Sequence, residues 1–248
     1  MKTALVTGGA KRIGEAIVQD LANNGFNVAI HSVSSNEAAE SLCELTLQKG
    51  VKACSVSGDL TDAQQTKDVF RNAINALGPI DLLVNNASIF EGDSAEEFNT
   101  EIWDKHFAIH VKAPAILAAE MIKQNLSEGL IVNMIDQRVK RLNPNFFSYT
   151  LSKSALWTAT QTMAQSFAPK LRVNAIGPGP TLPNERQEQQ DFDKQVKGIL
   201  MQRTPALKEF GRTIRYLYDT PSITGQLIAL DGGQHLAWET PDVAGIRE

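Results

Sequence analysis

Thr3–Gly14, with the sequence TALVTGGAKRIG, is the stretch that decides the fold of this 248-residue chain. The strand-like run Thr3–Val6 leads directly into a glycine turn, and a helical pattern opens at Ile13. Such a turn lets a ligand approach the backbone closely, and the helix N-terminus offers free N–H groups and a positive dipole end to a diphosphate. An ordinary strand–helix turn is the alternative, but strand before and helix after is the context that a dinucleotide loop requires. We therefore predict a dinucleotide-binding loop that uses Gly8, Lys11, Arg12 and Ile13.

Apolar strand-like runs alternate with helical patterns from one end of the chain to the other. Strands are expected at Thr3–Val6, Asn27–Ile30, Lys52–Val56, Asp81–Val84, Leu130–Asn133, Arg172–Ile176 and Leu227–Leu230. Helices are expected at Ile13–Asn23, Glu37–Lys49, Ala63–Leu77, Thr100–Gln124, Tyr149–Phe167 and Phe192–Tyr218. This alternation predicts an α/β chain with one domain over residues 1–248: a Rossmann fold whose seven-stranded parallel, doubly wound sheet carries helices on both faces.

Local signals refine this layout. Ser94–Glu97 has the pattern of a capping box ahead of the fourth helix, and Pro169 is expected to end the fifth. The polar segment over about 177–210 is expected to form a loop and a helix that cover a substrate, and 237–248 is a tail beyond the last strand.

The end of the second strand bears on cofactor choice. An NAD site would place an acidic residue here to bind the ribose 2′-hydroxyl. The sequence instead has a cluster of hydroxyl side chains after a histidine, with the cations of the first loop nearby. This pattern favours a 2′-phosphate, and so NADPH over NADH, with contacts from His31, Ser32, Ser34 and Ser35 together with Lys11 and Arg12.

Three side chains between residues 136 and 153 suggest proton transfer. Tyr149 and Lys153 are four residues apart and share one helix face, where the cation is expected to lower the pKa of the phenol. Asp136 adds a second acid shortly before them, although an aspartate at the end of a strand is also a common turn cap. We predict that Asp136, Tyr149 and Lys153 are catalytic.

Composition excludes several classes of function. The net charge of −4 and the scattered basic residues do not suit nucleic acid, and the cluster Arg138, Lys140 and Arg141 is interpreted as a solvated loop. Cys43 and Cys54 are expected to be free thiols in a reducing compartment, and the four dispersed histidines predict no metal site. No signal peptide and no apolar run of membrane-spanning length is apparent, so a cytoplasmic location is expected.

The motifs in combination resemble the short-chain dehydrogenase/reductase family, from Thr3 to about Leu236. They are TGGAKRIG, Asp59-Leu60, Asn85-Asn86-Ala87, Tyr149 with Lys153, Pro178-Gly179, and Thr224-Gly225 with Asp231-Gly232-Gly233. The resemblance implies that Asp59 contacts the adenine, with Leu60 beside it as a cofactor-binding residue, and that Asn85, Asn86 and Ala87 line the central cleft. It further implies that Lys153 holds the nicotinamide ribose and that Pro178, Gly179 and Thr181 lie at the carboxamide. It also implies a homotetramer whose interface is formed by the helices at Thr100–Gln124 and Tyr149–Phe167.

Two departures from the general family pattern are informative. Asp136 replaces the usual serine and Arg12 replaces the usual glycine, and both changes resemble the pteridine reductases, including the bacterial dihydromonapterin reductases. That resemblance implies that Phe90 stacks on a pterin, and that Ser88 and Arg12 contact the cofactor diphosphate or the substrate. Phe90 as a core aromatic, and Arg12 as a purely diphosphate-binding cation, are the alternatives. His110 stands where many short-chain reductases have the asparagine of a proton relay, and the dihydromonapterin reductases also carry histidine there.

The resulting hypothesis is hydride transfer from NADPH to a pterin C=N bond, with Tyr149 protonating the nitrogen and Asp136 and Lys153 assisting. Two other functions are open at this point. One is a carbonyl reductase for another substrate, such as a 3-oxoacyl group. The other is a non-catalytic dinucleotide-binding regulatory protein, against which the Tyr149 and Lys153 pair argues.

Overall fold

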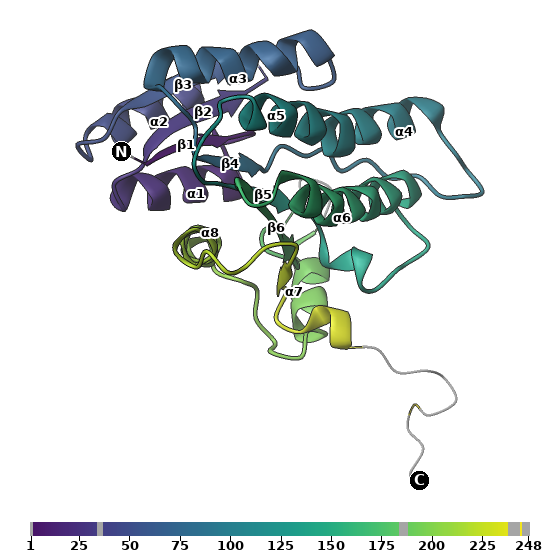
Figure 1. Ribbon diagram of the computed structural model, residues 1–248. Helices are drawn as coiled ribbons and strands as arrows, with labels where there is room; N and C mark the ends of the chain where they lie inside the picture. Colours follow the sequence, from purple (N-terminus) through teal and green to yellow (C-terminus); the bar gives the residue numbers. More distant parts are fainter. Residues whose placement is uncertain (1, 34–36, 184–187, 238–243, 245–248) are drawn as a thin grey trace.

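The computed structural model describes residues 2–33, 37–183, 188–237 and 244. Seven parallel strands form one sheet in the order β3-β2-β1-β4-β5-β6-β7 (Figure 1). Their bounds are β1 Thr3–Val6, β2 Asn27–Ser32, β3 Ala53–Ser57, β4 Leu82–Asn85, β5 Gly129–Met134, β6 Leu171–Pro178 and β7 Leu227–Leu230. The predicted seven-stranded, doubly wound parallel sheet is confirmed, and the strand order reverses between β1 and β4.

Helices link successive strands. They are α1 Arg12–Asn23, α2 Glu37–Leu47, α3 Ala63–Leu77, α4 Thr100–Phe107, α5 Ala113–Ile122, α6 Phe147–Phe167, α7 Gln189–Lys197 and α8 Leu207–Asp219. Two 3₁₀ turns, η2 Gln137–Val139 and η3 Gln234–Leu236, follow β5 and β7. The expected helix Thr100–Gln124 contains a π-helical segment, η1 Ala108–Lys112, between α4 and α5. Such a segment inside a helix is often found at a functional site.

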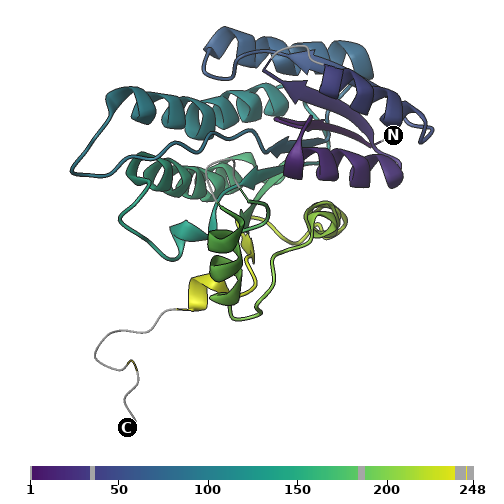
Figure 2. The same ribbon diagram turned by 180° about the vertical axis from the view of Figure 1, so that it is seen from behind.

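The expected single helix Phe192–Tyr218 is wrong, because α7 and α8 are separate. Gly198 follows the last residue of α7, and Pro205 lies between the helices, where it cannot continue a helix. Figures 1 and 2 both show α7 apart from the other helices and beside η3. A hydrogen bond from the Met201 N–H to the Gly232 carbonyl links the segment after α7 to the turn before η3.

The starts of two helices also differ from prediction. The Ser94 hydroxyl does accept from the Glu97 N–H over 2.9 Å, but this forms a turn before the helix, and Asn99 is the cap of α4. Helix α6 begins two residues before the expected Tyr149, because Asp93 from a distant loop caps it. The Ser148 N–H donates to Asp93 Oδ1 over 2.9 Å.

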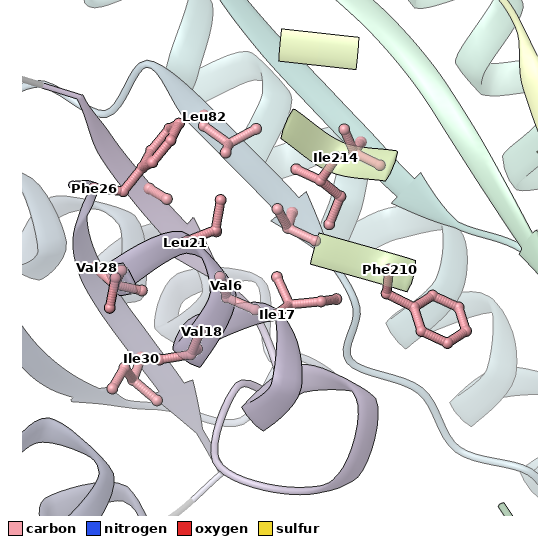
Figure 3. Close-up of a cluster of buried hydrophobic side chains, with 14 of the residues drawn as sticks. Val6, Ile17, Val18, Leu21, Phe26, Val28, Ile30, Leu82, Phe210 and Ile214 are labelled. Atoms are coloured by element: carbon pink, nitrogen blue, oxygen red, sulfur yellow. The ribbon is translucent and has the colours of Figure 1, made fainter. Parts of the chain in front are cut away.

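Alternate residues of the strands divide the core into two layers. Ala4 and Val6 of β1 face α1, α2 and α8, whereas Leu5 faces α3, α5 and α6. Figure 3 shows the first layer, where side chains of α1 and α8 meet β1 and β2. The members labelled there are Val6, Ile17, Val18, Leu21, Phe26, Val28, Ile30, Leu82, Phe210 and Ile214.

Because every strand is parallel, all the carboxyl ends lie at one edge of the sheet. Val6 pairs in register with Val84, and Asn85 pairs with Asn133, so the segments after β1, β4 and β5 emerge side by side. This edge at a switch of strand order is where open α/β sheets bind ligands.

Candidate active site

The loop after β1 is shaped by two glycines. Gly8 has a φ of +59°, and a Cβ built on Gly14 would lie 2.1 Å from the Gly8 carbonyl oxygen. A side chain at position 14 therefore cannot fit without moving the loop. Arg12 also has a positive φ, of 55°, which gives a physical reason for the glycine that the family usually has there.

The segment after β4 fastens this loop to the sheet. The Asn86 amide donates to the carbonyls of Thr7 and Gly8 over 2.9 and 3.0 Å. The backbone N–H groups of Asn86 and Ala87 both donate to the Thr7 hydroxyl. Asn86 and Ala87, which were predicted to line the cofactor cleft, thus hold the loop after β1 in place.

His31 plays a different part from the predicted contact with a 2′-phosphate. Its ring is 1% exposed, its Nδ1 accepts from the Gly8 N–H over 3.0 Å, and its Nε2 lies 2.9 Å from the Gly58 carbonyl. Burial lowers the pKa of His31, which keeps the ring neutral. Both nitrogens are thus engaged within the protein, and His31 fastens the first loop to the end of β3.

Of the other residues predicted for the adenosine half, Lys11 is exposed and Ser32 is buried at the end of β2. Ser34 and Ser35 lie outside the described residues. Asp59 follows β3, where its Oδ1 accepts from the Thr61 N–H over 2.8 Å, and Leu60 is 5% exposed.

The three predicted catalytic side chains meet at the end of β5. The Tyr149 hydroxyl donates to Asp136 Oδ2 over 2.9 Å, and Lys153 Nζ donates to the Met134 carbonyl over 2.9 Å. Lys153 Nζ lies 5.7 Å from the centroid of the Tyr149 ring. Strand β5 positions the aspartate, and consecutive turns of α6 position the tyrosine and the lysine.

The electrostatics differ from the expectation that Lys153 lowers the pKa of the phenol. Burial and the neighbouring Asp136 charge raise the pKa of Tyr149 well above its ordinary value, and Arg138 only partly opposes this shift. Burial also lowers the pKa of Lys153 to about 8, although Asp136 opposes that shift. Tyr149 is therefore a protonated phenol at neutral pH, as a proton donor must be.

Arg138 is a site residue that the sequence analysis missed, because its basic cluster was interpreted as a solvated loop. Its backbone N–H donates to Asp136 Oδ1 over 2.8 Å, and its Nη1 lies 3.0 Å from Asp136 Oδ2 in an ion pair. Arg141 is also engaged, since its Nη1 donates to the Gln234 carbonyl over 3.0 Å, whereas Lys140 is exposed. No sequence motif distinguished Arg138 from its basic neighbours; only its position two residues after Asp136 could have indicated it.

Phe90 lies in an aromatic cluster beside this pair. Its ring stacks on Phe146 with centroids 4.2 Å apart, and it meets the Tyr149 ring edge to face at 4.8 Å. The Arg138 guanidinium lies 5.3 Å from the Phe90 centroid. Phe90 is thus part of the site wall, and Phe146 is a second aromatic that the sequence analysis did not single out.

His110 connects the segment after β4 to helix α6. Its Nε2 lies 2.9 Å from the Ser88 hydroxyl, and its Nδ1 lies 2.8 Å from the Ser152 hydroxyl. The Ser152 hydroxyl in turn donates to the Tyr149 carbonyl over 2.7 Å. Burial, followed by the charge of Lys153, lowers the pKa of His110 well below its ordinary value, so His110 is neutral. This histidine fixes the distance between Ser88 and the turn of α6 that carries the phenol.

These groups border a cavity of about 290 Å³ at the carboxyl edge of the sheet. The predicted residues around it are Arg12, Ile13, Asn86, Ser88, Phe90, Asp136, Tyr149, Lys153, Pro178, Gly179 and Thr181. Arg12 crosses to the opposite wall, where its Nη1 donates to the Pro183 carbonyl over 3.2 Å. Three further lining residues, Phe192, Gln195 and Gln234, come from α7 and η3 and were not named individually by the prediction. Phe192 and Gln195 lie within the segment over about 177–210 that was expected to cover a substrate, whereas Gln234 had no signal in the sequence.

Two further features of the described residues bear on the class of site. Within these ranges, no group of three or more His, Cys, Asp or Glu side chains is arranged to hold a metal ion. None of the helices in the described part of the chain combines the length and the apolar character needed to cross a membrane.

The seven-stranded parallel sheet, with Tyr149 and Lys153 at its carboxyl edge, is the architecture of a short-chain dehydrogenase. A family model described as short chain dehydrogenase matches residues 2–194, and the chain belongs to this family. The expected family is therefore confirmed.

Two solved structures of this family are much more similar to the chain than the family in general. The chain is 55% identical to FolM alternative dihydrofolate reductase 1 from Brucella canis, determined in complex with NADP, with a TM-score of 0.94 over 98% of this chain and 97% of that one. The corresponding Brucella suis structure, also in complex with NADP, has the same identity and TM-score and 98% coverage of both chains. Among curated relatives, the 3-oxoacyl-[acyl-carrier-protein] reductase FabG of Staphylococcus epidermidis (strain ATCC 35984) is 28% identical over 95% of this chain and 99% of its own length.

Proposed function

We propose that this protein is an NADPH-dependent reductase that transfers hydride to the C=N bond of a dihydropterin or a related pteridine or folate. The observation that carries the proposal is the 2.9 Å hydrogen bond from Tyr149 to Asp136 inside the cavity. A carboxylate stands there in place of the serine usual in this family, as in pteridine reductases. The Brucella FolM proteins, which are named as dihydrofolate reductases, support the same substrate class.

Tyr149, Asp136 and Lys153 have different roles in the proposed proton transfer. Hydride addition to the carbon of a C=N bond leaves charge on the nitrogen, which must receive a proton. Tyr149 supplies that proton, since the raised pKa of its phenol keeps the hydroxyl protonated until substrate binds. Asp136 orients the hydroxyl, and Lys153 offers a cation 5.7 Å from the phenol ring that stabilises the phenolate after transfer.

The N-terminus of α1 fits the diphosphate of a dinucleotide, because the first backbone N–H groups of a helix have no partner within the helix. Gly14 lets this first turn of α1 pack closely against the Gly8 carbonyl and so shapes the loop that would hold the diphosphate. A bound dihydronicotinamide supplies the hydride, and the protein supplies placement. We propose that Lys11, Ser32, Ser34 and Ser35 surround the 2′-phosphate, that Asp59 and Leu60 lie at the adenine, and that Pro178, Gly179 and Thr181 lie at the carboxamide.

The substrate half of the cavity suits a flat ring. Phe90 provides an aromatic wall, and the Ser88 hydroxyl and the Arg12 guanidinium provide polar contacts at its border. The segment over about 177–210, which includes α7, covers this region in the proposal, since Phe192 and Gln195 line the cavity.

A 3-oxoacyl reductase is the second candidate. The FabG relative favours it, and Tyr149 with Lys153 would serve a carbonyl substrate equally well. Asp136 and the aromatic wall argue for the pterin.

We also propose a homotetramer assembled through α4, α5 and α6. Phe98 is 51% exposed beside Trp103 and Phe147 at the outer ends of α4 and α6, which is the kind of aromatic surface that a subunit contact would bury.

The test is NADPH oxidation at 340 nm with dihydrobiopterin, dihydromonapterin, dihydrofolate and an acetoacetyl thioester. We expect turnover with at least one pteridine. Turnover of the thioester alone would favour the second candidate. Saturable NADPH binding without any turnover would indicate a non-catalytic role.

A further inference from the structure

Arg138 contacts both the proton-transfer pair and the aromatic wall of the cavity. On one side, its backbone N–H and its Nη1 both reach the Asp136 carboxylate, over 2.8 and 3.0 Å. On the other side, its guanidinium carbon lies 5.3 Å from the Phe90 centroid and 5.5 Å from the Phe146 centroid. One side chain thus contacts the partner of the proton donor and the aromatic wall.

The surroundings make these contacts stronger than those of a surface arginine. The Arg138 and Asp136 side chains are 17% and 12% exposed, so their ion pair is only weakly screened by solvent. The guanidinium carbon lies at nearly equal distances from the centroids of the stacked Phe90 and Phe146 rings, which places the cation beside the stacked pair and within about 6 Å of both rings. The Arg138 Nε is buried without a hydrogen-bond partner in the described structure, so the side chain retains an unused donor.

Asp136 Oδ2 is the point where the contacts converge. It accepts from both the Tyr149 hydroxyl and Arg138 Nη1, over 2.9 and 3.0 Å. A carboxylate held by the backbone and the side chain of the same arginine has little freedom to rotate away from the phenol. The position of the Tyr149 hydroxyl proton therefore depends on Arg138. This dependence is indirect, because in the described structure both residues bond to Asp136 and not to each other.

We propose that Arg138 is a positioning residue of the reductase site: it holds the Asp136 carboxylate against the Tyr149 hydroxyl and fixes the Phe90 ring beside them. This inference rests on the proposed function.

The test is a double-mutant cycle of Arg138→Met and Asp136→Asn, because only coupled residues give non-additive effects. Methionine keeps most of the length and the apolar stem while removing the charge and the donors. We expect Arg138→Met to lower kcat by about 10–100-fold, the effect of a lost hydrogen bond to a charged group, with the KM for NADPH unchanged. In the Asp136→Asn background, the same substitution should change kcat by less than about threefold, because its partner is already absent.

Two further variants separate positioning from general damage. Arg138→Lys keeps the cation and should restore part of the lost kcat, because an ammonium replaces the charge of the guanidinium but not its planar fork of donors. Lys140→Met removes a neighbouring exposed cation and should behave as wild type. Equal losses for Arg138→Met in both backgrounds, or wild-type kcat in Arg138→Met, would overturn the proposal.

A failure of the positioning role of Arg138 can be distinguished from a failure of the proposed pteridine reductase activity. If wild type reduces only the acetoacetyl thioester, the pteridine proposal fails, and the cycle is measured with the thioester instead. If wild type reduces nothing, the cycle is measured by thermal unfolding: Arg138→Met should lower Tm in the wild-type background and have a smaller effect in Asp136→Asn. Additive shifts in Tm would then overturn the positioning role.

Discussion

The Tyr149 hydroxyl donates to Asp136 Oδ2 over 2.9 Å, a bond between the exit of β5 and the first turn of α6. The two residues are 13 positions apart in the sequence, and the segment between them carries Arg138 and Phe146. The bond brings the phenol, the carboxylate and the aromatic wall into one small volume of the cavity.

Replacement of Asp136 tests the role of this bond. Asp136→Asn keeps the shape but removes the negative charge, so the amide can no longer hold the phenol as a carboxylate does. We expect kcat for the dihydropterin to fall by about 10²–10⁴-fold, the usual range for general acid assistance. NADPH binding, measured by fluorescence, should remain. Full activity in this variant would contradict the role assigned to Asp136, and Asp136→Ser, which restores the residue usual in the family, should shift preference toward carbonyl substrates.

Phe90 is expected to act on substrate binding more than on chemistry. Phe90→Leu keeps an apolar side chain but removes the stacking face, which is typically worth about 1–3 kcal/mol for a planar heterocycle. The KM for the dihydropterin should therefore rise by roughly tenfold or more, while the KM for NADPH stays constant. Tyr216→Leu, at an aromatic residue on α8 that is 54% exposed, is the matched control. An unchanged KM in Phe90→Leu would mean that Phe90 is only a core aromatic.

The phosphate loop makes a steric prediction. Gly14→Ala would place a Cβ 2.1 Å from the Gly8 carbonyl oxygen, a contact that can be relieved only by moving the loop. We expect the Kd for NADPH, from titration of cofactor fluorescence, to rise by at least about tenfold, with a lower Tm. Gly198→Ala is the control, because its Cβ would meet its nearest neighbour at an ordinary 3.5 Å. Similar Kd values for both variants would show that the loop adapts.

Buried histidines are expected to make the free energy of unfolding depend on pH. Burial lowers the pKa values of His31, His106 and His110 below the ordinary 6.5. Below about pH 6.5 the unfolded chain therefore binds more protons than the folded chain, so the free energy of unfolding falls as the pH falls. Each histidine contributes at most about 1.4 kcal/mol per pH unit in this window.

Urea unfolding between pH 7 and pH 5 measures this slope. His110→Asn removes one of the three groups and should give a shallower slope than wild type. Equal slopes for the two proteins would show that His110 takes up its proton without resistance from the fold.

The strands were predictable because each has a local cause. Thr3–Val6 and Leu227–Leu230 are short apolar runs between breakers, and both strands begin and end where the pattern predicted. Periodicity alone did not divide Phe192–Tyr218 into α7 and α8, because a polar helix and a following amphipathic helix can share one continuous pattern. Gly198 and Pro205 are the local signals in the sequence that would have predicted the break.

Among the site residues, those with a chemical signature were found from the chain alone, whereas Arg138 was not. Glycine positions, a tyrosine and a lysine four residues apart, and an acid after a strand are all local patterns, so the sequence by itself indicated the family, the glycine loop after β1 and the candidate catalytic side chains. Tertiary structure decided how they are tuned. Burial raises the pKa of Tyr149 although its lysine neighbour favours the opposite shift, and the fold turns His31 inward and Arg138 toward Asp136. These outcomes depend on desolvation and on contacts between distant segments, which local patterns in a chain do not contain.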